Sequence, residues 1–168
     1  MLTKVQLRAI VLMGKSVKLL QNLLLNVSQA DATTFRDPND GDKGWTVLEV
    51  VCHLCDFEEV GRLRIKMLRE EENPRFPMWD HDVLVTEKAY NQQDLNEVLQ
   101  TLLKSRKALQ ESFTTLPAEA WEGSGVHPEY GDYTMTDVAL QVGWHDVNHL
   151  EQITRILNER KSESGNDH

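Results

Sequence analysis

Three histidines lie within segments whose apolar spacing predicts long helices, and they are the strongest chemical signal in the sequence. His145 and His149 are four residues apart, so one helical turn places both imidazoles on the same face. His53 lies about two turns after the start of another predicted helix, on a face that also carries apolar residues. If these two helices run parallel, the depths of the three imidazoles differ by roughly 3–6 Å. Three neutral imidazoles plus water are a common ligand set for a divalent catalytic metal.

Two other interpretations apply to these histidines. A histidine on an apolar helix face can simply be a hydrogen-bonded core residue. The segment from His145 to His149 has the spacing of the H-E-x-x-H zinc protease motif, but Asp146 replaces the glutamate that acts as the base. In the longer metzincin form, Gln152 stands where the glycine is required and Arg155 where the third histidine is required. The sequence therefore argues against a protease of either type.

Residues close to His53 extend the predicted site. Asp56 and Glu49 lie about one turn to either side of His53, and Asp56 is the better candidate for a general base or for an acceptor that orients a ligand. Cys52 and Cys55 form a C-x-x-C pair, but Cys55 points about 200° away from His53 on a helix, so the two cannot share one metal. We expect two reduced, partly buried thiols that neither bind metal nor form a disulfide.

Further titratable residues fall in two predicted connections. Asp80, His81 and Asp82 lie in one connection, and His127 lies in another. The simpler interpretation is that they are solvated loop residues, although either connection could cover the site.

Four segments with helical periodicity must position these residues, at about 3–27, 46–72, 94–115 and 134–160. Thr46 with Glu49 predicts a capping box, and Thr134 with Asp137 has a similar form. No segment shows convincing strand alternation, and all prolines lie outside the four helix interiors. The fold class predicted is all-α: a four-helix bundle. Its connections, 29–45, 73–93 and 116–133, are long enough for a crossover topology, and a short helical turn is possible near Pro117.

Length and composition set the remaining limits. The chain has 168 residues, which fits a single domain over residues 1–160 followed by a frayed polar tail at 161–168. The formal net charge is −9, which argues against a nucleic-acid partner and against an anionic membrane surface. No stretch approaches 18 apolar residues, and the first residues lack the features of a signal peptide, so we expect a cytoplasmic protein without a membrane span.

Three stretches of the sequence resemble the DinB-like superfamily. The resemblance covers nearly the whole chain, from the first helix to about Arg160. The matching stretches are Gly44-Trp45-Thr46 leading into Val50-Val51-Cys52-His53-Leu54-Cys55-Asp56-Phe57-Glu58, then Gly125-Val126-His127-Pro128-Glu129-Tyr130-Gly131, and finally His145-Asp146-Val147-Asn148-His149-Leu150-Glu151-Gln152-Ile153.

The resemblance implies several properties. The family fold is a four-helix bundle with a crossover connection, and a divalent metal, commonly nickel or zinc, is held by three histidines that match His53, His145 and His149. Relatives include S-transferases and isomerases that use a low-molecular-weight thiol such as bacillithiol or mycothiol, and others are named as metal-dependent hydrolases. The resemblance also implies a homodimer.

The leading hypothesis is a metal-dependent S-transferase that acts on small electrophiles through a metal-activated cofactor thiolate. The metal would lower the pKa of a bound thiol, and two nearby helix N-termini would favour a developing anion. One alternative is a metal-dependent hydrolase that uses hydroxide, with Asp56 as the base. Others are a non-catalytic module that binds metal or ligand, and a helical interaction protein whose histidines are structural.

Overall fold

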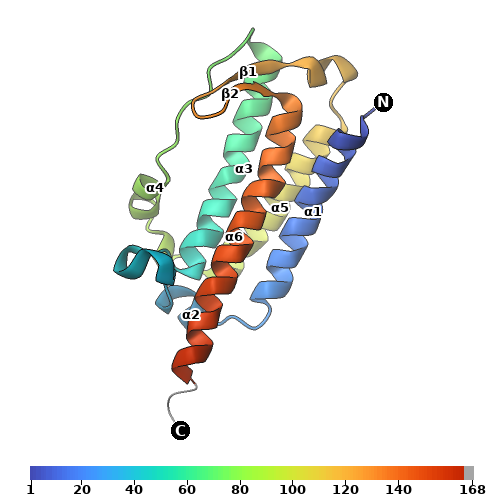
Figure 1. Ribbon diagram of the computed structural model, residues 1–168. Coiled ribbons are helices and arrows are strands. Elements are labelled where there is room, and N and C mark those ends of the chain that lie inside the picture. Colours follow the sequence, from blue (N-terminus) through green and yellow to red (C-terminus); the bar gives the residue numbers. More distant parts are fainter. Residues whose placement is uncertain (165–168) are drawn as a thin grey trace.

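Four long helices form the body of the protein, as the sequence predicts (Figure 1). The computed structural model describes the backbone of residues 1–164 and the side chains of residues 1–41 and 43–158. The long helices are α1 (Lys4–Leu24), α3 (Val47–Glu70), α5 (Leu95–Thr114) and α6 (Met135–Ser164). The connections contain α2 (Gln29–Thr34), α4 (His81–Glu87) and the 3-10 helices η1 (Pro38–Lys43), η2 (Tyr90–Gln92) and η3 (Ala118–Glu122).

The helix starts follow from local hydrogen bonding. The Thr46 hydroxyl accepts from the Glu49 backbone N–H while the Glu49 carboxylate accepts from the Thr46 backbone N–H, which confirms the predicted capping box of α3. The Asp94 carboxylate caps α5 by accepting from the Glu97 backbone N–H. These side chains satisfy N–H groups that have no partner inside their helix, so the chain itself specifies where the helices begin.

The bundle contains a crossover. In α3 and α5, Glu58 pairs with Arg106, and three residues further along each helix Gly61 packs against Leu109, so the two helices run parallel as neighbours. Parallel neighbours cannot be joined by a tight turn, and the segment between Glu70 and Leu95 returns along the bundle. Figure 1 shows α4, which belongs to this segment, outside the four long helices.

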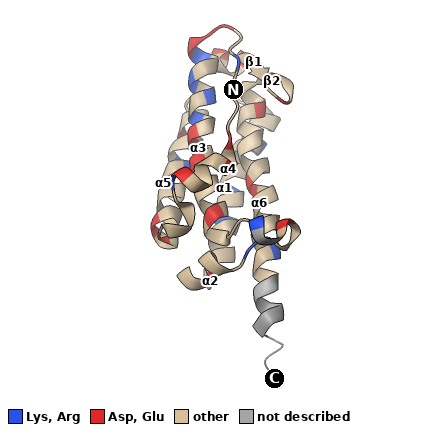
Figure 2. Cartoon of the chain, turned by 90° about the vertical axis from the view of Figure 1, so that its left-hand side faces the viewer, with Lys and Arg blue, Asp and Glu red and all other residues tan. Residues whose placement is uncertain are grey.

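Helices α1 and α6, the first and last of the four, also run parallel. Gln6 contacts Thr136 near the start of both, and Ser16 donates to Asp146 further along. No helix in the described part of the chain is both long and apolar enough to cross a bilayer. On the side presented in Figure 2, basic and acidic residues of the described part are interspersed, without a continuous basic face.

A short β-hairpin precedes α6, and the expectation of a chain without strands is wrong here. Strands β1 (Ser124–His127) and β2 (Gly131–Thr134) pair antiparallel, and Gly131 takes a positive φ of 75° at the turn. Each strand has only four residues, too few for a clear alternation. The hairpin is held by the distant chain: Val126 N–H donates to Pro74 O at 2.8 Å, and Phe76 N–H donates to Val126 O at 3.0 Å.

The end of α6 also differs from the prediction. This helix continues to Ser164, so the segment predicted as a tail at 161–168 is helical in its first half. Residues 165–168 lie outside the described part of the chain.

Candidate metal centre

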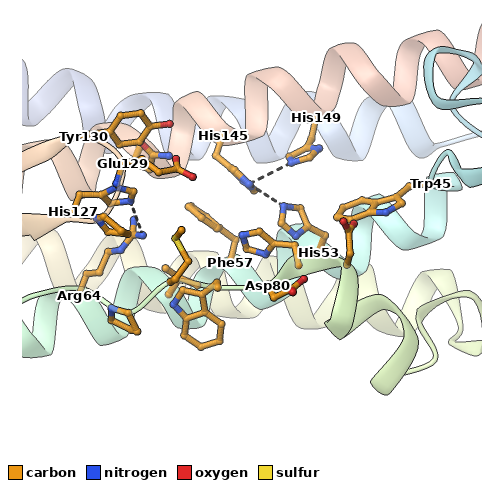
Figure 3. A pocket seen from close by; sticks show the side chains of 18 residues that line it. Trp45, His53, Phe57, Arg64, Asp80, His127, Glu129, Tyr130, His145 and His149 are labelled. Atoms are coloured by element: carbon orange, nitrogen blue, oxygen red, sulfur yellow. Dashed lines mark hydrogen bonds between the residues drawn. The ribbon is translucent and has the colours of Figure 1, made fainter.

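The three predicted histidines meet in space. His53 comes from α3, and His145 and His149 come from α6. The Nε2 atom of His145 lies 2.9 Å from Nε2 of His53 and 3.2 Å from Nε2 of His149 (Figure 3). One candidate ligand atom from each side chain lies within 4.8 Å of both others. The structure therefore brings together the nitrogens that the sequence proposed as metal ligands.

The helices that carry them run antiparallel, which corrects the sequence argument. His53 faces His149, and Phe57 of the next turn stacks on His145. One turn further along α3, Gly61 packs near Val142. Residue numbers therefore rise along α3 while those of the contacted residues fall along α6. The imidazoles meet because His53 lies 17 residues before the end of α3 and His149 lies 14 residues after the start of α6, at similar distances from the hairpin end of the bundle.

The predicted support from two helix N-termini is also wrong. His53 is about two turns from the start of α3, but His145 and His149 lie in the middle of α6, beyond the turn over which a helix dipole acts.

Hydrogen-bonding capacity indicates that this cluster fits a cation. A ring nitrogen offers either one proton or one lone pair in the ring plane, so Nε2 of His145 cannot bond to both neighbouring Nε2 atoms at once. His149 Nδ1 donates to the acceptor-only Oε1 of Gln152 at 2.7 Å, which leaves the lone pair on His149 Nε2. A tetrahedral zinc with bonds of about 2.0–2.1 Å separates its ligands by roughly 3.3 Å, close to the two spacings between Nε2 of His145 and its neighbours.

Burial keeps these imidazoles neutral. Loss of solvent, followed by repulsion from His149 and His81, lowers the pKa of His53 to about 2. The same causes hold the pKa of His145 well below its usual value. For His149, desolvation again lowers the pKa, against a smaller opposing effect of the Gln152 hydrogen bond. Neutral imidazole is the form that binds metal, so the site is preset for ligation at neutral pH.

Aromatic rings fix the orientation of the histidines. Phe57 stacks on His145 with ring centroids 3.7 Å apart, and Trp45 stacks on His149 at 6.5 Å. Trp45 follows Gly44, where a Cβ would lie 2.3 Å from the backbone oxygen of Asp37. Only glycine allows this approach, so the local sequence explains how the tryptophan is brought against the histidines.

A cavity of about 640 Å³ extends from the histidines along the bundle (Figure 3). The three ligand candidates line one end, and the far end is lined by Arg64, His127 and Tyr130. Asp80, His81, Asp82 and His127 all line this cavity. The interpretation as solvated loop groups is wrong for His127, which is buried, and for His81, which is half-buried, whereas Asp80 and Asp82 are exposed as that interpretation expected. Their two connections cover the site because the crossover segment and the hairpin pack together, which no local sequence signal reveals.

Asp56 does not lie with the histidines. Its Oδ2 accepts from Lys88 Nζ at 2.7 Å and from the Tyr90 hydroxyl, and it lines a separate cavity together with Cys52 and Cys55. The geometry gives no support to its predicted role as a general base, because Lys88 and Tyr90 hold the carboxylate in the cavity on the Cys52 side of α3.

The two cysteines are free thiols, as predicted. Burial raises the pKa of Cys52 to about 12 and that of Cys55 to about 11, so both stay protonated at neutral pH.

A buried charge network, which sequence reasoning missed, lies beside the site. Arg106 of α5 donates to Glu58 of α3, to Asp146 of α6 and to the Met13 carbonyl of α1. Asp146 is the neighbour of His145 and also accepts from Ser16. One guanidinium therefore connects all four long helices next to a candidate ligand.

Comparisons with known proteins agree with this architecture. The profile described as the DinB superfamily matches residues 15–153. "Putative metal-dependent hydrolase OB0782" of Oceanobacillus iheyensis is 30% identical over 146 residues, which span 83% of this chain and 78% of the relative. "Putative metal-dependent hydrolase YfiT" of Bacillus subtilis is 27% identical over 116 residues, 68% of this chain and 65% of the relative.

A solved structure shows the same fold. It is that of YfiT from Bacillus subtilis, described as "a probable metal-dependent hydrolase with an unusual four-helix bundle topology". It matches with a TM-score of 0.81 and 21% identity, covering 96% of this chain and 91% of YfiT.

Proposed function

The chain belongs to the DinB superfamily, and from this premise we propose that it is a divalent-metal-dependent hydrolase of a small molecule. The observation that carries the proposal is the convergence of three Nε2 atoms on one end of a 640 Å³ cavity. The relatives whose names describe a metal-dependent hydrolase support the same reaction class.

His53, His145 and His149 would hold the ion through Nε2, and zinc or nickel suits three imidazole ligands. When bound, such an ion supplies Lewis-acid polarisation of a carbonyl and lowers the pKa of water toward neutrality. Gln152 fixes the tautomer of His149. Phe57 holds the ring plane of His145 by stacking.

His81 is the proposed proton acceptor. Its ring centroid lies 4.5 Å from that of His53, and it lines the cavity without belonging to the ligand cluster. Desolvation lowers the pKa of His81, so its imidazole is neutral and able to accept a proton at neutral pH. Apolar side chains along the wall, including Phe57, Val60 and Trp79, would contact the apolar part of the substrate.

The comparisons favour hydrolysis over the thiol transfer that the sequence put first. The two named relatives are described as hydrolases.

The test begins with metal content. Untagged protein, purified without a nickel column, is analysed for bound metal, stripped with a chelator and reloaded with zinc or nickel. Hydrolysis of ester and amide substrates is then measured in parallel with consumption of an electrophile in the presence of bacillithiol or mycothiol.

We expect metal-dependent hydrolysis without added thiol. His145→Ala should remain helical by circular dichroism, with a lower melting temperature, no bound metal and no hydrolysis. His127→Ala, in the same cavity but outside the ligand cluster, should keep its metal. Full hydrolysis after chelation would show that the metal takes no part in the reaction. Turnover that requires added thiol would overturn the proposed hydrolysis in favour of thiol transfer.

A further inference from the structure

The far end of the cavity contains a buried cation without a counter-ion. Arg64 is only 6% exposed and lines the cavity, and no carboxylate of the described residues lies within 4.0 Å of its guanidinium as an ion pair. Glu129 contributes a favourable charge interaction from further away, and it is exposed. A buried arginine is usually paired, because removing the charge from water costs free energy that an anion must offset. Desolvation indeed lowers the pKa of Arg64.

The neighbours of Arg64 supply aromatic faces in place of acceptors. The guanidinium carbon lies 5.4 Å from the ring centroid of Phe76 and 5.9 Å from that of Tyr133, within the range of cation–π attraction. These rings offer no in-plane lone pair to the N–H groups of Arg64. Its Nε is a buried donor with no partner among the described residues. The charge is therefore tolerated, but at least one donor remains unsatisfied.

His127 increases the excess of donors. Its Nδ1 lies 3.1 Å from the Glu129 backbone N, and its Nε2 lies 3.0 Å from Nη2 of Arg64 (Figure 3). A neutral imidazole carries one proton, so only one of its nitrogens can accept. His127 can therefore accept from the Glu129 N–H or from the Arg64 N–H but not from both, and one of these two donors faces a protonated ring nitrogen. An oxyanion beside Arg64 would accept the N–H groups for which His127 offers no lone pair.

The position of this donor cluster relative to the histidines is set by one helix. Arg64 follows His53 by 11 residues on α3, which is three turns and about 20° of rotation, so both lie on the same face. The rise between their Cα atoms is roughly 16 Å. Long helical side chains lean back toward the N-terminus, which brings the guanidinium closer to the metal end. A short molecule could contact both ends of the cavity at once.

We propose that Arg64 and His127 form an oxyanion-binding subsite that selects substrates with a carboxylate or phosphate at the end remote from the hydrolysed bond. That the bound anion is part of a substrate rests on the proposed hydrolysis. The binding of an anion at this place depends only on the groups described above. Arg64 binds the anion through its planar N–H fork, and His127 adds a third donor in the tautomer that carries the ring proton on Nε2.

The test measures binding separately from turnover. Metal-free protein is used first, so that an added anion cannot bind at the metal. Hexanoate, hexyl phosphate and neutral hexanamide are titrated by calorimetry and by thermal shift into wild type, Arg64→Met, Arg64→Lys and Arg62→Met. Arg62 is the matched control, because it belongs to the same helix but pairs with Glu59 at the surface.

We expect at least one of the two anions, and not hexanamide, to bind wild type and Arg62→Met. The comparison of hexanoate with hexyl phosphate identifies which oxyanion the site takes. Arg64→Met should lose roughly 10–100-fold in affinity, the effect of removing charge-assisted hydrogen bonds. Arg64→Lys should keep part of the affinity, and it serves as the test if Arg64→Met does not fold. Zinc-loaded protein should show the same ranking of variants.

Equal affinity of wild type and Arg64→Met for the anions would overturn the proposal, and so would hexanamide binding as tightly as both. The two proposals fail separately. Anion binding that depends on Arg64 in a protein without hydrolase activity would leave the subsite standing. If anionic and neutral substrates were hydrolysed at equal rates and Arg64→Met did not change these rates, the proposed hydrolase activity would stand and the proposed anion subsite would be wrong.

Discussion

Arg106→Met would remove the guanidinium that connects the four long helices. The Arg106 side chain is 2% exposed, and its partners Glu58 and Asp146 are 0% and 6% exposed. Its N–H groups reach Glu58 at 2.5 and 2.8 Å, Asp146 at 2.5 and 3.0 Å and the Met13 carbonyl at 2.9 Å. Methionine keeps most of the volume but leaves two buried carboxylates facing each other without a cation.

The expected loss follows from this burial. Removing one partner of a buried ion pair destabilises a protein by about 3–5 kcal/mol, because the remaining charge is neither solvated nor paired. At roughly 2–4 °C per kcal/mol for a chain of this size, the melting temperature should fall by about 6–20 °C. The loss should shrink as the pH is lowered from 8 toward 5. Desolvation already raises the pKa of Glu58, and without Arg106 this carboxyl takes up a proton at still higher pH, which removes the buried charge.

The assay is urea unfolding followed by circular dichroism at several pH values. Lys107→Met, an exposed neighbour on the same helix, is the control and should stay within about 0.5 kcal/mol of wild type. The triple variant Arg106→Leu/Glu58→Met/Asp146→Leu should recover most of the stability, since it removes the charges together. A cost for Arg106→Met below about 1 kcal/mol, or one that grows at low pH, would refute the reasoning.

Three further predictions concern the histidine site. Gln152→Leu should weaken metal binding by roughly 10–100-fold, measured by competition with a chromophoric chelator, because His149 loses the acceptor that fixes its tautomer. Metal-free protein should lose stability as the pH falls below about 6.5. The depressed pKa of His53 means that the unfolded chain binds protons which the folded one does not, so melting temperatures measured from pH 8 to pH 5 should fall. The double variant Cys52→Ala/Cys55→Ala should keep metal content and hydrolysis, since both thiols are protonated and lie in another cavity.

Each of these has a contrary outcome. Unchanged affinity in Gln152→Leu would mean that the His149 ring is held by stacking alone. A flat melting temperature between pH 8 and pH 5 would mean that the imidazoles are solvated in the metal-free protein. Loss of hydrolysis in the double cysteine variant, with its metal retained, would give the thiols a chemical role.

The sequence by itself determined the four long helices and the three histidines. Helices depend on information that is local in the chain: an apolar stripe, a capping threonine such as Thr46, and prolines kept to the connections. The pairing of His145 with His149 is local in the same way, because one helical turn separates them. The place of His53 opposite them was expected, but from a parallel arrangement of helices that the structure does not have.

The tertiary structure alone decided the direction of packing, and with it the rest of the site. Asp56 was chosen for its closeness to His53 in the chain, yet rotation about α3 turns it into another cavity. The hairpin and the crossover segment, which carry His127 and His81 over the histidines, pair through contacts between residues some fifty apart in the chain. Arg64 and Arg106 both look like ordinary charges of amphipathic helices. Only the packing of neighbouring helices and loops removes these two arginines from water. No local spacing in the sequence encodes this burial, and it is burial that makes an unpaired or paired charge matter for stability and binding.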